Sequence, residues 1–225
     1  MQKQTVLIIG TVWVEPNSSA AGKRMLQLIH QFLKRADKII FAATSLKSEK
    51  AIDLTSLGVK EVTIQLNHTS FDDFIKELQP NIVLFDRFMT EEQFGWRVAE
   101  YCPKALRILD TEDLHCLRKT REFCVKNKIN FTKDELLKQD ITKREIASIL
   151  RCDLSLIIST FEMDLLKNLF KIDEAIVMYL PFLFDEISKH QQEKWKNFGD
   201  RQHFIFIGNY FHKPNVNAVL ILKKE

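Results

Sequence analysis

Residues 107–121 read R-I-L-D-T-E-D-L-H-C-L-R-K-T-R. The segment begins with the end of an apolar strand (Ile108, Leu109) and continues into a helix with Leu114 and Leu117 on one side. Acidic and basic side chains fill the junction between the two. In an open parallel sheet, ligands bind beyond the carboxyl ends of the strands. The pattern therefore predicts a strand-to-helix unit and, at its junction, a candidate site.

The titratable residues of this junction are Asp110, Glu112, Asp113, His115, Arg118, Lys119 and Arg121. An ordinary helix start explains the same residues. Thr111 would cap the helix, Glu112 and Asp113 would complement its positive end, and the basic side chains would face water. Both interpretations remain open from this segment alone.

The rest of the chain alternates apolar, β-branched runs with helical patterns. Such alternation is typical of an α/β fold with a parallel sheet and helices on both faces. The predicted strands are Thr5–Ile9, Lys38–Ala43, Glu61–Leu66, Ile82–Phe85, Leu106–Leu109, Leu154–Ile158 and Ala175–Met178.

The first predicted strand leads into P-N-S-S-A-A-G-K-R, residues 16–24. Ser18 or Ser19 is expected to cap the next helix. The small residues let a ligand approach the backbone, and a helix start offers N–H groups to an anion. A tight strand-to-helix turn explains the loop equally well. Lys23 and Arg24 could either meet a phosphate or face water.

Two other strand ends carry charged residues. Asp86 and Arg87 follow the fourth predicted strand, and Glu162 lies just after the sixth. Three Ser/Thr residues are followed three positions later by Glu or Gln, which predicts capping boxes. These pairs are Thr90–Gln93, Thr132–Glu135 and Ser159–Glu162.

Composition excludes several classes of function. The 225-residue chain has 33 basic and 30 acidic residues, a net charge of +3, which does not favour nucleic-acid binding. Its four cysteines form no C-x-x-C pair, so neither a metal site nor a disulfide framework is expected. No signal peptide or membrane span is present, which predicts a cytoplasmic protein. Two basic amphipathic helices, one ending near Lys126 and one covering 132–150, leave peripheral contact with the inner face of a membrane open.

The pattern changes near the end of the chain. Residues 1–183 are predicted to form one α/β domain, and 184–203 a polar connecting segment. A new strand, Phe204–Ile207, and a helix starting at Pro214 follow. One strand and one helix cannot bury a core. Residues 204–225 are therefore expected to open a second domain.

The tail F-I-F-I-G-N-Y-F-H-K-P-N-V-N-A-V-L-I-L (residues 204–222) resembles the start of the nucleotide-sugar-binding domain of family-four-type glycosyltransferases. Three other segments agree with that family in order and spacing. They are P-N-S-S-A-A-G-K-R, L-D-T-E-D-L-H-C-L-R and C-D-L-S-L-I-I-S-T-F-E. The resemblance implies the GT-B fold, in which a Rossmann-like N-terminal domain mostly binds the acceptor and a second domain mostly binds the sugar nucleotide.

The same resemblance implies a set of site residues. The implied catalytic residues are Glu112, Asp113 and His115. Relatives carry a His-Asp pair where this chain has Glu112-Asp113, so the base or sugar-hydroxyl binder remains open among the three. The implied substrate- or donor-binding residues are Asn17, Ser18, Gly22, Arg24, Asp110, Arg118, Glu162, Asn209 and His212. The first loop departs from the family because it lacks the double glycine common there.

The implied activity is transfer of a sugar, with retention of configuration and without a metal, from a nucleotide sugar to a glycan, lipid-linked or small-molecule acceptor. The family's Lys/Arg pair and later acidic segment of the donor site would lie beyond Glu225. The 225 residues are therefore expected to be the acceptor-side half, inactive without a C-terminal donor domain. The alternative from another class is a non-catalytic Rossmann-like binding module.

Overall fold

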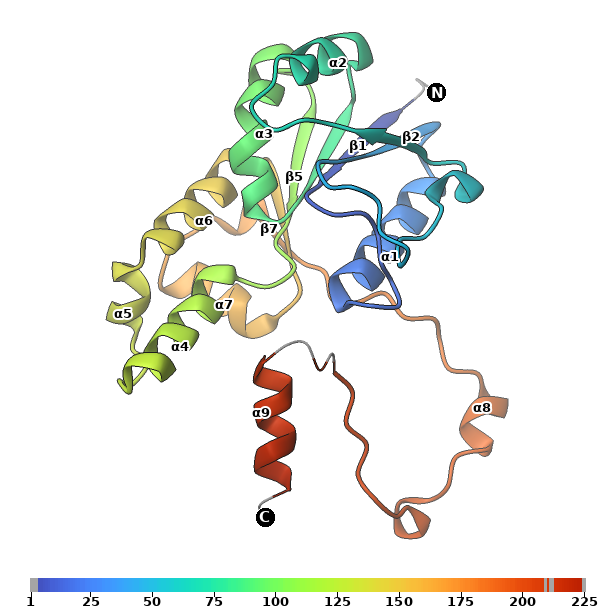
Figure 1. Ribbon diagram of the computed structural model, residues 1–225, viewed down its shortest axis with the longest axis vertical. Helices are drawn as coiled ribbons and strands as arrows, with labels where there is room; N and C mark the ends of the chain where they lie inside the picture. Colours follow the sequence, from blue (N-terminus) through green and yellow to red (C-terminus); the bar gives the residue numbers. More distant parts are fainter. Residues whose placement is uncertain (1–3, 209, 211–212, 224–225) are drawn as a thin grey trace. The chain divides into compact units, whose positions relative to one another are not determined.

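A seven-stranded parallel sheet forms the centre of the protein. The computed structural model describes residues 4–208, 210 and 213–223 (Figure 1). The strands are β1 (Thr5–Gly10), β2 (Lys38–Ala43), β3 (Lys60–Thr63), β4 (Ile82–Asp86), β5 (Leu106–Asp110), β6 (Leu154–Ile157) and β7 (Val177–Tyr179). Their order is β3-β2-β1-β4-β5-β6-β7, and every pairing is parallel. The α/β class is confirmed, and each of the seven predicted strands overlaps one of these strands, although Ala175 and Ile176 lie in the short 3-10 helix η2 (Glu174–Ile176).

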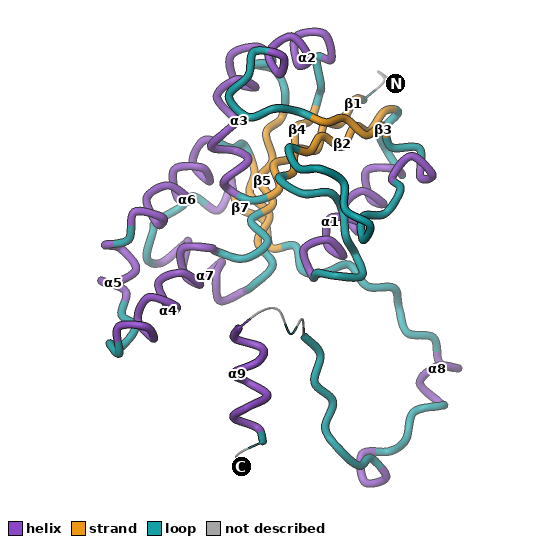
Figure 2. The backbone as a smooth tube through the Cα atoms, in the orientation of Figure 1, coloured by secondary structure: helices purple, strands orange, loops and turns teal. Residues whose placement is uncertain are grey.

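Helices cover both faces of the sheet, as Figure 2 shows by colour. The longer helices are α1 (Ala20–Leu33), α2 (Ser70–Leu78), α3 (Phe88–Tyr101), α4 (His115–Asn127), α6 (Asp140–Arg151) and α7 (Thr160–Asn168). One core contains residues of α1 and the short 3-10 helix η1 (Leu54–Leu57), and the other contains residues of α2, α3, α4, α6 and α7. This two-layer cover is what an all-parallel sheet requires.

The residues of β1 show why the sheet needs both layers. Val6 and Ile8 belong to the core on the α1 face, whereas Leu7 and Ile9 belong to the opposite core. Successive side chains of a strand point to opposite faces, so a continuous apolar run serves two cores at once. All four side chains are fully buried.

The strand order reverses beside β1. Thr5 of β1 aligns with Lys38 of β2 on one side, and Val6 aligns with Ile82 of β4 on the other. The loops that follow β1 and β4 therefore leave the sheet toward opposite faces. A crevice opens at such a reversal, and this is where open α/β sheets bind ligands.

The structure corrects several local predictions. The helix predicted over 132–150 is broken into α5 (Lys133–Lys138) and α6 by Gln139, which is extended. The predicted strand Phe204–Ile207 is not a strand. The Thr90–Gln93 capping box is absent, because α3 begins at Phe88 and the Thr90 hydroxyl donates to backbone carbonyls. Thr132 and Ser159 do cap their helices through their side chains.

The chain divides into a compact unit of residues 1–182 and a second unit of 183–225. The second unit contains the helices α8 (Lys189–Glu193) and α9 (Lys213–Leu222) and the 3-10 helix η3 (Phe198–Asp200). None of its described residues is buried, and Phe204 is 99% exposed. Within the described part of the chain, no helix is long and apolar enough to cross a membrane.

Candidate functional site

Two carboxylates end neighbouring strands at the reversal of the sheet. Asp86 is the last residue of β4, Asp110 is the last residue of β5, and the two are directly aligned. Both are buried, at 4% and 0% exposure. Arg87, which directly follows Asp86, donates its backbone N–H to the Asp110 carbonyl over 2.8 Å. The carboxyl edge of the sheet thus brings several charged groups close together, two of them buried carboxylates.

The backbone at this edge is held in an unfavourable conformation. Arg87 has φ 71° and Glu112 has φ 64°, although neither is a glycine. Left-handed conformations of this kind are costly for long side chains and cluster at functional sites. Here Arg87 directly follows β4, and Glu112 lies two residues after the end of the adjacent strand β5.

Arg24 and Asp110 form a buried ion pair. The Arg24 Nε lies 2.9 and 3.0 Å from the two Asp110 carboxylate oxygens, and Nη2 lies 2.8 Å from one of them. The Arg24 side chain is 1% exposed. Sequence alone left Arg24 open between phosphate and water, and the structure places it against a carboxylate instead. Burial raises the pKa of Asp110 to about 6.

Asp86 forms a second ion pair with the adjacent residue. The Arg87 Nε and Nη2 donate to the two Asp86 oxygens over 3.0 and 3.2 Å. Burial raises the pKa of Asp86, and the Arg87 charge opposes this rise. Arg87 also lies near the charges of Glu112 and Asp113. Its positive charge therefore interacts with three acidic residues, Asp86, Glu112 and Asp113.

Glu112 is a third buried acid of the site with a raised pKa. It is 7% exposed, and its Oε1 has no hydrogen-bond partner among the described residues. Burial, followed by the charges of Asp110 and Asp86, raises its pKa to about 8. At neutral pH the carboxyl group is therefore mostly protonated and can donate a hydrogen bond, a behaviour known from acids kept neutral in apolar sites.

His115, Asp113 and Arg118 form a small network one turn further on. The His115 Nε2 lies 3.4 Å from Asp113 Oδ1, and Arg118 Nε donates to Asp113 Oδ2 over 2.7 Å. Burial lowers the pKa of His115 to about 4, against the attraction of Asp113. The imidazole is thus neutral at pH 7, and Phe88 packs edge-on against it.

Two carboxylates from other helices occupy the start of α4. Glu145 of α6 accepts the backbone N–H groups of His115 and Cys116 over 3.0 and 2.7 Å. Glu162 of α7 accepts the N–H of Leu114 over 3.0 Å. The predicted capping box at Ser159 is therefore incomplete, because the Glu162 carboxylate accepts the N–H at the start of α4 and does not return to the Ser159 backbone. These N–H groups are already paired within the protein and are not open to a phosphate.

The loop after β1 is arranged around Glu15 and Gly22. Ser19 caps α1 by accepting the Gly22 N–H over 3.0 Å. A Cβ on Gly22 would lie 2.3 Å from the Glu15 carbonyl oxygen, so only glycine allows this approach. Ser18 donates to the Glu15 carboxylate over 2.5 Å, and this bond is the main cause that lowers the Glu15 pKa. Asn17 is exposed in the same turn.

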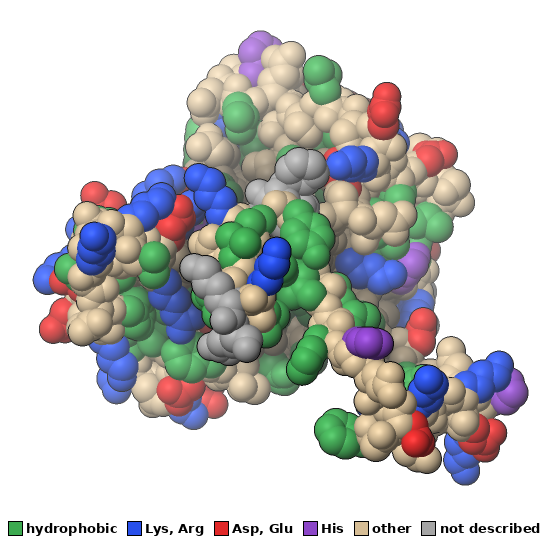
Figure 3. Space-filling view, turned by 60° about the horizontal axis from the view of Figure 1, so that its bottom comes forward, with side chains coloured by type: hydrophobic (Ala, Val, Ile, Leu, Met, Phe, Trp, Pro, Cys, Tyr) green, Lys and Arg blue, Asp and Glu red, His purple; other side chains and the backbone are tan. Residues whose placement is uncertain are grey.

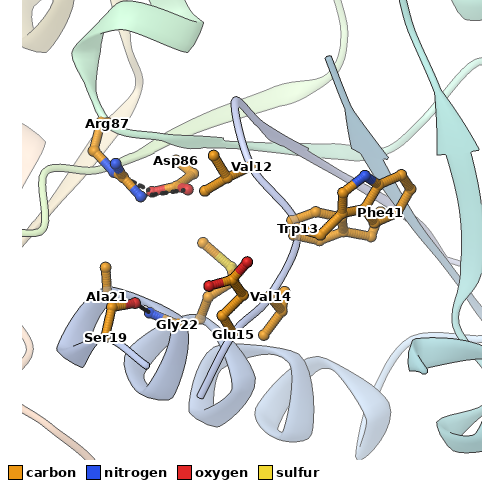
Figure 4. A pocket seen from close by; sticks show the side chains of 11 residues that line it. Val12, Trp13, Val14, Glu15, Ser19, Ala21, Gly22, Phe41, Asp86 and Arg87 are labelled. Atoms are coloured by element: carbon orange, nitrogen blue, oxygen red, sulfur yellow. Dashed lines mark hydrogen bonds and ion pairs between the residues drawn. The ribbon is translucent and has the colours of Figure 1, made fainter. Parts of the chain in front are cut away.

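A cavity of about 90 Å³ lies between the loop after β1 and the loop after β4. Figure 4 shows Asp86 and Arg87 on one side of it, and the Glu15 carboxylate and the start of α1 on the other. This volume holds a few water molecules. A sugar ring would enter it only in part, through a hydroxyl group or another polar substituent.

The structure thus brings together some of the residues implied by the sequence and separates others. Around Asp110 it gathers Arg24 and Glu112, with Asp113, His115 and Arg118 in the following turn. Gly22 and Ser18 lie beside the cavity, and Asn209 and His212 lie outside the described residues. No group of three or more His, Cys, Asp or Glu suited to a metal ion occurs in the ranges that the structure describes.

Sequence reasoning missed Glu145, and it explained Asp86 and Arg87 as a salt-bridged loop, a pairing that the structure shows. Glu145 had a visible signal, because it stands at helical spacing between Ile141 and Ile149 on an apolar face. A charged residue there must find a buried partner.

The sequence matches no protein-family model and no curated protein. Among solved structures, it is similar to an alpha-glucosyltransferase in complex with UDP-glucose and DNA containing an abasic site. That match has 14% identity and a TM-score of 0.49, and it covers 88% of this chain and 47% of the other. A lipopolysaccharide outer core galactosyltransferase, WaaB, matches with 14% identity and a TM-score of 0.47, over 79% and 46% of the two chains.

A putative NAD-dependent epimerase/dehydratase from Methylobacillus flagellatus also matches, with 8% identity, a TM-score of 0.41, and 71% and 55% coverage. The chain spans about half the length of the glycosyltransferases that it matches. The expected resemblance to GT-B glycosyltransferases is thus found again among structures. At these identities and scores the likeness concerns the fold.

Proposed function

We propose that residues 1–183 are the acceptor-side domain of a retaining GT-B glycosyltransferase that transfers a sugar from a nucleotide-sugar donor. Residues 184–203 would connect it to donor-binding sequence beginning at 204. The observation that carries the proposal is Glu112, a buried acid with an unpartnered oxygen, next to Asp86, Asp110 and Arg87 at the reversal of the sheet.

Within this proposal, the acidic groups have different tasks. Glu112 donates a hydrogen bond to a sugar oxygen, because its carboxyl group is protonated at neutral pH. The neutral His115, oriented by Asp113, accepts a hydrogen bond from the acceptor hydroxyl. In the reaction, this hydroxyl oxygen bonds to the anomeric carbon, the bond from that carbon to the donor phosphate breaks, and the hydroxyl proton leaves with the phosphate.

The residues of the loop after β1 and the start of α1 would shape the site and contribute few charges to it. Gly22 lets α1 approach the loop, and Ser18 fixes the Glu15 carboxylate beside the cavity. Arg24 is occupied by Asp110, so it would act by holding that carboxylate and not by binding phosphate itself. Asn17, Arg118 and Glu162, together with Asn209 and His212 in the tail, remain predicted binding residues.

Binding of saccharides to the 225-residue chain tests the proposal. We expect methyl glycosides and nucleotide sugars, titrated at pH 7 by NMR, to shift resonances of the loops after β1, β4 and β5. Glu112→Ala, which removes the donating carboxyl group, should weaken saccharide binding about tenfold, the range expected when a hydrogen bond to a buried group is lost. The exposed Glu122→Gln should change nothing. Absence of saccharide binding, or equal effects of both variants, would contradict the proposal.

A non-catalytic binding module is the second candidate, favoured by one observation. The backbone N–H groups at the start of α4 donate to Glu145 and Glu162, and the Arg24 guanidinium donates to Asp110. These donors are therefore bonded within the protein and are not free to bind a ligand. Such a module would bind a ligand in the cavity without turnover. Sugar transfer by the chain combined with a donor-binding domain would exclude it.

Peripheral membrane contact also remains a prediction. The surface of α4 and α5 carries many Lys and Arg side chains, visible on one side of Figure 3. Several of them pair with acidic neighbours, as Lys119 and Lys126 both do with Glu122. A lipid-linked acceptor would suit this surface.

A further inference from the structure

Arg24 is a buried cation on an otherwise apolar helix face. The other buried residues of α1 are Gly22, Met25, Leu28 and Ile29. A guanidinium group carries five N–H donors in a rigid plane, so it can bind several partners in fixed directions. Burying it is unfavourable unless those donors are satisfied.

The donors of Arg24 are divided between two parts of the fold. One edge of the guanidinium, formed by Nε and Nη2, binds the carboxylate of Asp110 at the end of β5. Its Nη1 donates to the carbonyls of Leu180 and Pro181 over 2.8 and 3.3 Å. These two residues directly follow β7, where the chain leaves the sheet. The Phe182 ring lies 6.0 Å from the guanidinium carbon.

No hydrogen bond or ion pair joins Asp110 directly to Leu180 or Pro181 among the described residues. The Leu180 N–H of the chain exit also donates to the Ile157 carbonyl of β6 over 2.8 Å. The guanidinium of Arg24 is therefore the bridge between the candidate site and the point where the chain leaves the sheet.

We propose that Arg24 is a positioning residue that couples the Asp110 carboxylate of the candidate site to the chain exit at Leu180 and Pro181. The guanidinium binds the Asp110 carboxylate on one side and the Leu180 and Pro181 carbonyls on the other, which fixes the orientation of its plane. That orientation in turn fixes the positions of the carboxylate and of the two carbonyls. A ligand or substitution that draws Asp110 away from Arg24 loosens the exit, and displacement of the exit disturbs Asp110. Such coupling is reciprocal by necessity.

Hydrogen exchange of the backbone amides measures this coupling without any assay of sugar transfer. Asp110→Asn keeps the shape of the side chain and weakens its bond to Arg24. We expect exchange of the Leu180 and Phe182 amides to rise at least about tenfold in this variant, because bonds to a charged group contribute strongly. Amides in the middle of β1 and β4 exchange through global unfolding, so their rates report the overall loss of stability, and the rise at Leu180 is judged against them. The effect is remote, since Asp110 does not contact either residue of the exit.

A second variant asks whether the effect passes through Arg24. Arg24→Gln should itself raise exchange at Leu180, and Asp110→Asn should add less than about twofold in that background, as expected for a shared network. If Arg24→Gln fails to fold cooperatively, Arg24→Lys takes its place, because one ammonium group cannot reach both sets of partners. Full additivity of the two substitutions would refute the coupling.

The chain offers a matched control. Arg97 of α3 binds Asp72 of α2 over 2.5 Å and also donates to the His68 carbonyl over 3.3 Å. It is a largely buried Arg–Asp pair with a carbonyl partner, and it lies on other elements. Asp72→Asn should leave the exchange of Leu180 unchanged. An unchanged rate in Asp110→Asn, or an equal rise in Asp72→Asn, would overturn the proposal.

Discussion

Arg24 and Asp110 show how one buried pair is held at the level of single residues. The carboxylate is fully buried and the guanidinium nearly so. Removing both charges from water is costly. The folded protein offsets this cost because Nε, Nη1 and Nη2 of Arg24 all have acceptors. The carboxylate alone would be an uncompensated charge.

The first prediction concerns this pair. Arg24→Met should lower the free energy of unfolding by about 3–5 kcal/mol, because it leaves Asp110 buried without its partner. The double variant Arg24→Met/Asp110→Leu should lose less than the single one, since it removes both charges. Urea unfolding at pH 7 gives the two values. A double variant less stable than Arg24→Met would contradict this account.

The second prediction concerns Glu112. Its pKa of about 8 in the folded chain lies above the ordinary value of 4.5. Between these values the folded chain holds a proton that the unfolded chain releases. This group therefore makes the free energy of unfolding fall as pH rises from about 4.5 to about 8.

Glu112→Gln removes that titration. We expect the variant to be close to the wild type in stability near pH 5, and more stable than it by a few kcal/mol at pH 9. Urea unfolding across this range gives the difference. Glu122→Gln is the control, because the bond from Lys126 lowers the Glu122 pKa to about 2 and its titration lies below the range. A difference that stays constant with pH would show that Glu112 is not perturbed.

At the level of elements, helix α4 begins without a cap of its own. Its N-cap residue Leu114 has no capping side chain, and Glu145 and Glu162 take that role from α6 and α7. Three helices are thus fixed to one another at the candidate site, and His115 is placed by the same contacts.

The third prediction follows from this arrangement. Glu145→Ala leaves the N–H groups of His115 and Cys116 buried without an acceptor, so we expect a loss of about 2–4 kcal/mol in the free energy of unfolding. Glu135→Ala removes only a surface ion pair with Lys138 and should cost less than about 1 kcal/mol. Thermal and urea unfolding compare them, and equal losses would argue against the role of Glu145.

Much of the fold could be predicted from sequence, because burial leaves a periodic trace. Most strands of the sheet were visible as apolar runs, although β3 (Lys60–Thr63) has Val62 as its one apolar residue. The same signal failed at Phe204–Ile207, which is apolar but exposed and has no neighbouring strand. The capping pattern also misled at Glu162, since spacing identifies a possible local acceptor but not the stronger one on a distant helix.

The strand ends that meet at the candidate site could be predicted from the sequence, but their side-chain contacts could not. Strand ends could be aligned from the pattern, which brought Asp86 and Asp110 to one edge. The partner of Arg24 lies 86 residues away. Periodicity says nothing about such pairs, nor about the left-handed backbone of Arg87 and Glu112.

At the level of the whole molecule, the two units differ in how much they bury. Two apolar cores hold the first, whereas no described residue after Phe182 is buried. Segments without buried contacts open most readily.

The fourth prediction is therefore about proteolysis. Brief trypsin treatment should cut first at Lys189, Lys194, Lys196 or Arg201, which are all exposed. The exposed Lys23 of α1 serves as an internal control, because cleavage there requires unfolding of the helix. Mass spectrometry of the early fragments identifies the order, and early cleavage at Lys23 would contradict the prediction.

The order of the strands has a consequence for how the chain acquires its structure. Thr5 aligns with Lys38 and Val6 with Ile82, which lie 33 and 76 positions further along. No neighbouring strands are joined by a tight hairpin, so each pairing must first close a long loop. During synthesis, β1 is made before the other strands of this sheet but receives β4 as a partner only after the intervening residues have been translated. Until then its edge and both apolar faces are exposed, and the nascent protein depends on rapid docking of β4 to avoid association with other chains.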